Sequence, residues 1–367
     1  MGNWRNGELG NFITLKRGFD LPQQKREDGQ VPIFSSSGIT GTHSTAMVNA
    51  PGVITGRYGT IGEVFYAAED FWPLNTTLFV EDFHGNDAKF IYYFLKTLEW
   101  SKFTSASAVP GINRNTVHKE TVSLPDIETQ RRIASTLSML DEKIKTNTEI
   151  NDNLYAQAKA IFDNHFINID AIPAGWRKGN LLDIANYLNG LAMQKFRPQG
   201  NEIGLPVLKI KELRQGSCDD SSELCSLSIK PEYIIHNGDV IFSWSGSLLV
   251  DIWCGGTCGL NQHLFKVTSD VYDKWFYYLW TAHHLARFIA IAADKATTMG
   301  HIKREELAKA EVLIPCEEDY TSLTSIMQPI FELIISNRIE ARKLAALRDE
   351  LLPKLMSGEI DVSDVQI

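Results

Sequence analysis

The 367-residue chain is 44% hydrophobic, enough for two domains with cores of their own, and its net charge of −9 argues against a simple basic DNA-binding module. Five cysteines, an odd number, do not make a disulfide framework. The opening Met1-Gly2-Asn3-Trp4 lacks signal-peptide character, and no apolar run approaches the roughly 18 residues of a membrane helix, so we expect a cytoplasmic protein without membrane contact.

Residues 1–125 predict a first globular block of mixed α and β structure. Gly, Pro and Thr separate short apolar runs such as residues 31–34, a pattern typical of short strands joined by turns, and residues 88–100 predict a helix. The block carries 11 basic and 12 acidic residues. A near-neutral domain can still gather its basic side chains on one face.

Residues 126–170 predict a long helix, since no Pro or Gly occurs between 127 and 167. Apolar positions recur at alternating spacings of four and three, which is a coiled-coil seam. About 40 helical residues span roughly 60 Å, longer than a small domain needs. The seam positions are Ile133, Leu137, Leu140, Ile144, Asn147, Asn151, Leu154, Ala158 and Ile161.

Residues 171–315 predict a second globular block, with 15 basic and 15 acidic residues and a helix over 274–291. Residues 316–362 predict a second long helix, followed by a short tail over 363–367. Its seam repeats the first one 190 residues later: Leu323, Met327, Ile330, Ile334, Asn337, Ala341, Leu344, Arg348 and Leu351. The two helices could pair as an antiparallel coiled coil, or each could pack on its own domain.

The chain also repeats itself in short strings that keep their order. Leu-Asn-Thr-Thr-Leu-Phe at 74–79, for example, returns as Leu-Asn-Gln-His-Leu-Phe at 260–265. The offset drifts from 172 to 190 residues, as expected if loops differ in length. The other matches are 4–7 with 176–179, 53–54 with 240–241, 90–93 with 275–278, and 122–125 with 312–315. Five ordered matches favour a duplicated architecture over chance.

This plan resembles the specificity subunits of type I restriction–modification systems. The strongest local marks are Trp176-Arg177 followed by Leu181 and Ile184, the string at 237–241, and the closing string at 351–360. In the first repeat, Pro125 followed by Glu128, Gln130 and Ile133 is similar to the family's entry into its first long helix. The second copy, at 315–320, lacks the matching Gln.

The resemblance implies two α/β (α+β) target-recognition domains in a pseudo-two-fold repeat, bridged by a pair of long antiparallel coiled-coil helices. Each domain would read one half of a bipartite, asymmetric double-stranded DNA site. The helices would space the halves and dock two methylase subunits, and a motor and nuclease subunit would join for cleavage. The chain would be non-catalytic and bind no cofactor itself, while S-adenosylmethionine, ATP and Mg²⁺ would belong to partner subunits.

Searches for catalytic motifs point the same way. The chain has neither a phosphate-binding Gly-x-x-x-x-Gly-Lys nor Gly-x-Gly-x-x-Gly, and the Pro-Pro usual in adenine methylases is missing. Asp126 with Asp141 and Lys143 fits a nuclease spacing, but the latter two lie within the helical seam. Cys254, Cys258 and His263 lack a convincing fourth zinc ligand. The alternatives are a stand-alone nuclease or methylase, which the missing motifs oppose, and a helical scaffold without a DNA role.

Polar residues at predicted turns are the candidates for DNA contact, because Arg, Asn, Gln, Ser and Thr can bind base edges or phosphates. In the first block these are Ser35, Ser36, Ser37, Arg57, Tyr58, Thr60, Thr76, Thr77, Asn113 and Arg114. In the second block they are Lys209, Lys211, Arg214, Trp244, Ser245, Ser247, Gln262, His263, Lys303 and Arg304.

Residues that differ between the repeats are the better candidates for base contacts, since the two domains should recognise different short base sequences, or words. The differing pairs are Thr76 with Gln262, Thr77 with His263, and Arg57 with Trp244. Asn75 and Asn261 are the same residue in both copies, which favours a structural role.

Asn147 and Asn337 stand at the same place in the two seams, midway along each. Antiparallel packing about a pseudo-two-fold axis would bring the two residues together. Facing amides can satisfy one another, so we predict that this pair fixes the register of the helices.

Overall fold

The computed structural model describes residues 4–104, 110–294 and 302–365, which fall into two compact units. Unit 1 contains residues 1–143 and 344–367, and unit 2 contains residues 144–343. The two long helices, α3 (Ile127–Phe162) and α9 (Glu317–Met356), each contribute one part to each unit. The predicted domain boundaries at 125, 170, 315 and 362 remain a division based on sequence.

Unit 1 is built on a four-stranded antiparallel sheet of order β2-β8-β5-β6, beside a smaller sheet of order β4-β3-β7 and a ribbon of β1 and β9. Its strands are β1 (Arg5–Glu8), β2 (Thr14–Arg17), β3 (Val31–Ser35), β4 (Gly38–His43), β5 (Gly52–Gly56), β6 (Val64–Ala67), β7 (Trp72–Pro73), β8 (Thr77–Asp82) and β9 (Thr121–Leu124). Its short helices are α1 (Ala88–Thr97) and α2 (Arg114–His118).

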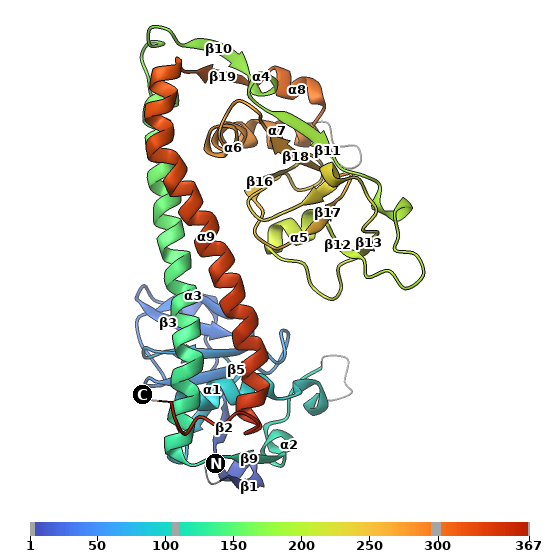
Figure 1. Cartoon of the computed structure of the whole chain (residues 1–367). Coiled ribbons are helices and arrows are strands. Elements are labelled where there is room, and N and C mark those ends of the chain that lie inside the picture. The colour runs from blue at the N-terminus through green and yellow to red at the C-terminus, as the bar shows by residue number, and fades with distance from the viewer. Residues whose placement is uncertain (1–3, 105–109, 295–301, 366–367) are drawn as a thin grey trace. The chain divides into compact units, whose positions relative to one another are not determined.

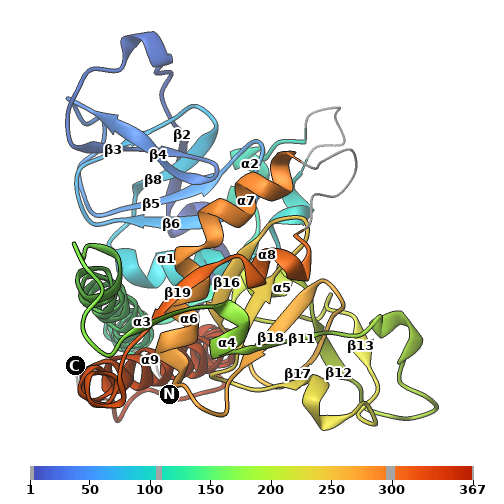
Figure 2. The ribbon, with the colours of Figure 1, turned by 90° about the horizontal axis from the view of Figure 1, so that it is seen from above.

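Side chains alternate between the two faces of this sheet, as the two-residue period of a strand requires. Val53 of β5 joins the core beneath α1, whereas its neighbour Ile54 packs with Phe34 of β3 and Phe79 of β8. In Figure 2, β3 and β4 lie on one side of the sheet and α1 on the other. Both faces of the sheet are therefore covered, and its exposed parts are the loops at the strand ends.

Unit 2 repeats this design. Its main sheet has the order β11-β18-β15-β16, the second sheet is β13-β12-β17-β14, and β10 pairs with β19. Its strands are β10 (Arg177–Asn180), β11 (Asn186–Asn189), β12 (Leu205–Leu208), β13 (Leu224–Cys225), β14 (Ile234–Ile235), β15 (Val240–Ser243), β16 (Leu249–Ile252), β17 (Cys258–Leu260), β18 (Leu264–Thr268) and β19 (Glu311–Ile314). Its short helices are α4 (Leu181–Ile184), α5 (Ile210–Gln215), α6 (Lys274–His283), α7 (Leu285–Asp294) and α8 (Arg304–Ala308).

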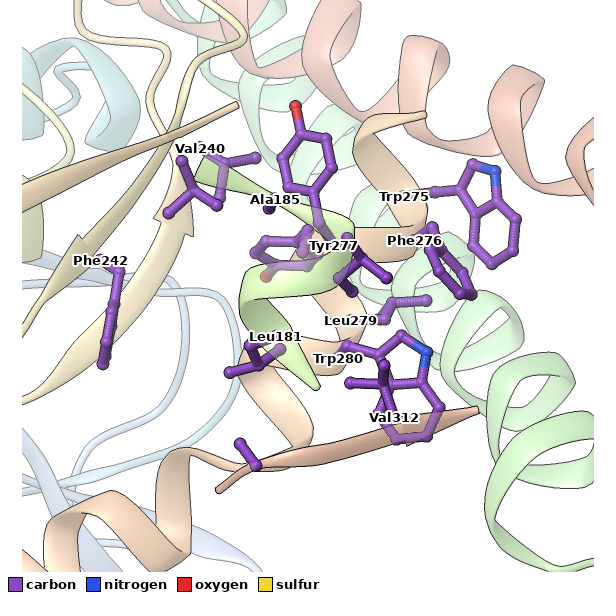
Figure 3. Close-up of a cluster of buried hydrophobic side chains, with 14 of the residues drawn as sticks. Leu181, Ala185, Val240, Phe242, Trp275, Phe276, Tyr277, Leu279, Trp280 and Val312 are labelled. Atoms are coloured by element: carbon purple, nitrogen blue, oxygen red, sulfur yellow. The ribbon is translucent and has the colours of Figure 1, made fainter. Parts of the chain in front are cut away.

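The core of unit 2 is rich in aromatic residues and is centred on α6. Figure 3 shows Trp275, Phe276 and Trp280 of α6 near Leu181 of α4 and Val312 of β19. Trp275 and Phe276 are almost completely buried. Aromatic side chains of this size bury large areas, so α6 anchors the sheet, the neighbouring short helices and the long helices of the unit in one core.

The prediction of a duplicated architecture is confirmed, because strand order and helix placement agree in the two units. One predicted helix is shorter than expected and another is broken in two. The helix predicted over 88–100 ends at Thr97, since Leu98 is extended and the Trp100 indole donates to the Leu95 carbonyl. The helix predicted over 274–291 is broken at His284, whose ring bonds the Glu311 carbonyl.

The long helices are paired and antiparallel, as predicted (Figure 1). In unit 1, the carboxylate of Asp141 on α3 forms an ion pair with the guanidinium of Arg348 on α9, at 2.6 Å. In unit 2, Asn147 and Asn151 lie opposite Glu340 and Asn337, so partner numbers fall along α9 as they rise along α3. None of the helices in the described parts of the chain combines the length and apolar composition needed to span a bilayer.

The prediction that Asn147 and Asn337 bond each other is wrong, because each side chain has a different partner. The Asn337 amide donates instead to Asn151 Oδ1, at 3.0 Å. The Asn147 amide donates to Glu340 Oε2 at 2.7 Å. Asn147 and Asn151 are one helical turn apart on the same seam, and the actual register brings the second of them to Asn337.

Candidate nucleic-acid interface

In unit 1 a tight turn follows β5 and carries Arg57, Tyr58 and Thr60. A Cβ atom at Gly56 would lie 1.9 Å from the Thr60 carbonyl oxygen, and Gly59 has a φ of +79°, so both glycines are needed for this turn. The Arg57 guanidinium lies 4.5 Å from the centre of the Tyr58 ring. Thr60 is exposed, while Arg57 and Tyr58 are partly exposed. The turn thus presents a cation–aromatic pair at the end of the main sheet.

The segment leading into α2 lies against this turn. Ile112 donates its backbone N–H to the Arg57 carbonyl at 3.0 Å, and the Arg57 Nε donates to the Ile112 carbonyl at 3.4 Å. Asn113 then caps α2 by accepting a bond from the Asn115 N–H at 3.0 Å. Asn113 and Arg114 are both exposed. These contacts place the two predicted residues beside Arg57.

The serine turn between β3 and β4 joins the same cluster through its middle residue. The Ser36 Cβ would lie 3.1 Å from a Cβ added at Gly56, and the Ser36 Oγ would lie 3.2 Å from a Cβ added at Gly59. Ser35 has a different role, because its hydroxyl donates to the Gly38 carbonyl at 3.1 Å and contacts the Ser37 hydroxyl at 3.0 Å. Ser35 and Ser37 therefore shape the turn, and Ser36 faces the Arg57 turn.

The two threonines after Asn75 separate in the structure. The Thr76 carbonyl accepts the N–H groups of Arg57 and Tyr58, so Thr76 belongs to the cluster. Thr77 is fully buried and its hydroxyl donates to the Leu74 carbonyl at 2.8 Å. The prediction that Thr77 contacts DNA is therefore wrong, because its hydroxyl already closes the turn. Asn75 bonds Asp20, which fits the structural role expected for it.

In unit 2 the corresponding residues surround a cavity of about 410 Å³. It is lined by Lys209 and Lys211 at the start of α5, and by Gln262 and His263 in the turn between β17 and β18. Arg197, which the sequence analysis missed, also lines it. Both Lys209 and Arg197 pair with Glu223, so part of the positive charge in the cavity is neutralised.

Gln194 is a second lining residue that the sequence analysis missed. It lies in the short helical turn Met193–Lys195, which follows an isolated parallel bridge between Leu191 and Asn261. Unit 1 has the same bridge between Phe19 and Leu74. This repeat of local structure has no shared sequence string, so the sequence did not indicate a role for the segment.

The turn after β15 contacts His263, one of the residues that line this cavity. Ser245 is buried, and its hydroxyl lies 2.9 Å from His263 Nδ1. A direct contact between Ser245 and DNA is therefore excluded by its burial, and the prediction is corrected to a supporting role. The Trp244 indole donates to Asn189 at 3.0 Å and its ring packs against Phe265, while Ser247 is exposed.

The remaining predicted cations lie on exposed surface. Lys211 pairs with Asp219 at 3.3 Å, and Arg214 is exposed in the last turn of α5. Lys303 precedes α8 and Arg304 begins it, with the Arg304 guanidinium donating to the Tyr187 carbonyl at 3.4 Å. Ile302, which directly precedes them, donates its N–H to the Trp244 carbonyl at 3.1 Å, so these two cations lie beside the turn after β15.

In the ranges that the structure describes, no group of three His, Cys, Asp or Glu residues could hold a metal ion. The five cysteines occur there as free thiols. Burial raises the pKa of the Cys254 thiol, so the thiolate that zinc requires is disfavoured at that residue. What the clusters offer is hydrogen-bond donors, acceptors and cations at loop ends.

The chain matches known proteins along nearly its whole length. The profile of the type I restriction modification DNA specificity domain matches residues 1–156 and 173–347. The chain is 26% identical over 310 residues to the type I restriction enzyme MjaIX specificity subunit of Methanocaldococcus jannaschii, covering 77% of this chain and 71% of that protein. It is 20% identical over 344 residues to the HindI specificity subunit of Haemophilus influenzae, covering 72% and 75%.

A solved structure has the same fold. The crystal structure of the type I restriction–modification system S subunit from M. genitalium aligns with a TM-score of 0.64 over 96% of each chain, at 16% sequence identity. A duplicated α+β chain with two long helices is thus a fold class already seen in a specificity subunit. The chain belongs to the family of type I restriction modification DNA specificity domains. Specificity subunits of these systems are non-catalytic and generally free of cofactors.

Proposed function

We propose that each unit reads one half of a bipartite double-stranded DNA site, unit 1 through the cluster around Arg57 and unit 2 through the cavity around Gln262. The observation that carries this proposal is that equivalent loops of two like folds bear unlike side chains. Arg57 occupies the turn that holds Trp244 in the other unit. Thr76, whose carbonyl accepts the Arg57 N–H, occupies the place of His263, whose carbonyl accepts the Trp244 N–H. Direct readout of different words requires different donors and acceptors on a shared scaffold.

The charge of the clusters supports binding to DNA. Arg114 in unit 1 and Lys303 in unit 2 are exposed cations that follow segments bonded to the Arg57 and Trp244 turns, and Arg214 is exposed in the last turn of α5. Such cations contact phosphates without sequence preference and make affinity depend on salt. The acidic excess of the chain lies largely outside the two globular blocks, as the nearly equal counts of basic and acidic residues in those blocks indicate.

The long helices are proposed to dock two methylase subunits. In unit 2, Ile326 and Leu333 are seven residues apart on α9 and about half exposed. On α3, Ile150 and Leu154 line a groove of about 300 Å³. Apolar side chains exposed at helical spacing are typical of a face that another helix covers. In unit 1, Met139 and Leu347 are exposed in the same manner.

In the assembled system the methylase subunits would carry S-adenosylmethionine, and motor and nuclease subunits would carry ATP and Mg²⁺. This chain would supply sequence recognition and spacing. The helix register in each unit would matter because the helices would set the gap between the half-sites.

Selection from a random-sequence duplex pool tests the proposal. The chain, assembled with its methylase subunits, should enrich two short words at one fixed gap. Affinity for the enriched site should fall steeply as salt rises. Binding that enriches no sequence, or a single uninterrupted word, would overturn the proposal.

A further inference from the structure

Three side chains of unit 2 form a continuous hydrogen-bonded series from the protein interior to the cavity. The Ser245 hydroxyl, buried with 4% exposure, lies 2.9 Å from His263 Nδ1. The other ring nitrogen, His263 Nε2, lies 3.4 Å from Gln262 Nε2. Gln262 and His263 both line the cavity of about 410 Å³. The series therefore links a buried group to the amide at the cavity wall.

The chemistry of the amide sets the direction of these bonds. An amide nitrogen can only donate, so His263 Nε2 must accept from Gln262. A neutral imidazole carries one N–H, which then resides on Nδ1 and donates to the Ser245 oxygen. Each contact in the series has one donor and one acceptor in this arrangement. With the proton on Nε2 instead, two donors would face each other.

The backbone holds the series in place. The His263 N–H donates to Asn261 Oδ1 at 3.2 Å, and the Gln262 N–H donates to the Leu191 carbonyl at 2.8 Å. The His263 ring centre lies 6.3 Å from that of Trp244. The Asn261 side chain thus shapes the turn that presents Gln262 and His263.

After its bond to His263, the Gln262 amide keeps one N–H and its carbonyl oxygen for a ligand. One donor beside one acceptor matches the major-groove edge of adenine, where N7 accepts and the N6 amino group donates. Guanine offers two acceptors at the same edge and would leave the amide oxygen unpaired. The nearby Lys211 adds a cation on the cavity wall that suits a phosphate.

We propose that Gln262 reads one adenine of the second half-site, and that Ser245 is a positioning residue that acts through His263. The proposal rests on the proposed function, because it assumes that unit 2 contacts DNA. It goes further by naming the base and the order in which the three residues act. It also explains a buried serine at a place where the sequence suggested a DNA contact.

The experiment measures base preference at every position of the enriched site for the wild-type chain and four variants, each assembled with methylase subunits. Ser245→Ala removes the inner bond, and His263→Asn can keep the bond to Ser245 while losing the one to Gln262. Both should lower the preference for adenine over guanine at one position of the second half-site by about tenfold. Gln262→Glu should move the preference at that position toward cytosine, since a carboxylate accepts from the cytosine amino group.

Thr281→Val is the matched control, because Thr281 is also buried and bonded, but to Tyr187 and Tyr277, and none of these three residues lines the cavity. It should leave every base preference unchanged. Because His263 is only partly buried, His263→Asn keeps the test informative if Ser245→Ala fails to fold. Unchanged preference in His263→Asn and Gln262→Glu, with DNA binding retained, would overturn the role of the series alone. A wild-type complex that enriches no sequence would instead overturn the proposed function.

Discussion

The Asn337 amide on α9 donates a 3.0 Å hydrogen bond to Asn151 Oδ1 on α3, and both side chains are buried. Asn151 donates in turn to the Ile334 carbonyl at 3.2 Å. A shift of one heptad would move these amides against other seam positions and break both bonds. We therefore predict that this pair fixes the register of α3 against α9 in unit 2.

Replacing Asn337 alone with Leu should destabilise the protein by about 1–3 kcal/mol, because Asn151 Oδ1 would stay buried without its donor. Replacing Asn151 and Asn337 together with Leu should recover that loss while allowing other registers. Urea unfolding measures both effects. The exposed variant Asn153→Ala should change stability by less than about 0.5 kcal/mol. Equal losses in the single and double variants would contradict a role for the pair in register.

The long helices could be predicted from sequence because their seams repeat over many turns, and α9 continues through both Pro329 and Pro353. The partner of Asn337 could not. Position along a seam gives the face of a helix, whereas register depends on the packing of both helices. The break at His284 was also hidden, since it depends on the Glu311 carbonyl, far away in the sequence.

Stability should fall as the pH drops below the ordinary histidine pKa of 6.5. Burial lowers the pKa of His118 and His284, so the folded chain prefers both rings neutral. As the pH falls, the unfolded chain binds protons at these histidines before the folded chain does. The contribution of the two neutral rings to the free energy of unfolding is therefore fully present above pH 6.5 and is lost as the pH falls from 6.5 through the lowered pKa values. His118 Nε2 also accepts the Leu15 N–H at 2.9 Å, a bond that protonation removes.

Urea unfolding across this pH range tests the point. The variants His118→Gln and His284→Gln should each show a shallower fall of stability with acid than the wild type. Exposed Gln157, which does not titrate, offers a control, and Gln157→Ala should leave the slope unchanged. Slopes that match the wild type in both buried-histidine variants would show that other groups carry the acid response.

Gly56→Ala should weaken binding of the first half-site, because a Cβ there would collide with the Thr60 backbone and displace the turn that carries Arg57. Gly85→Ala serves as the control. Gly85 has a φ of +82° but open space around its Cβ position, so this variant strains the backbone without disturbing the cluster. Binding to duplexes altered in one half-site separates the effects. Full first half-site recognition by Gly56→Ala would remove this turn from the interface.

Arg57→Ala should weaken the first half-site by about 1–3 kcal/mol if the guanidinium contacts a base, and leave the second half-site unchanged. Arg17→Ala is the matched control, since Arg17 is an exposed arginine of the same unit that pairs with Asp20. Competition binding with altered duplexes measures both. Equal losses of affinity in the two variants would show that Arg57 contributes only sequence-independent electrostatic attraction to DNA.

The candidate interface was only partly predictable. Loop chemistry identified Arg57, Gln262 and His263, because polar residues between apolar strands must lie at strand ends. Burial of Thr77 and Ser245 was not predictable, since their hydroxyls bond groups that the turn itself brings close. Arg197 was missed because its place in the cavity depends on pairing with Glu223.

Mapping methylated adenines in cells tests the central claim, that the two units read separate words. Cells would carry the methylase subunits with either the wild-type chain or a chain whose residues 1–125 come from another family member. The wild-type chain should give one bipartite motif, and the exchanged chain should change one half of it while keeping the other half and the gap. A change in both halves, or methylation without a bipartite motif, would contradict the account.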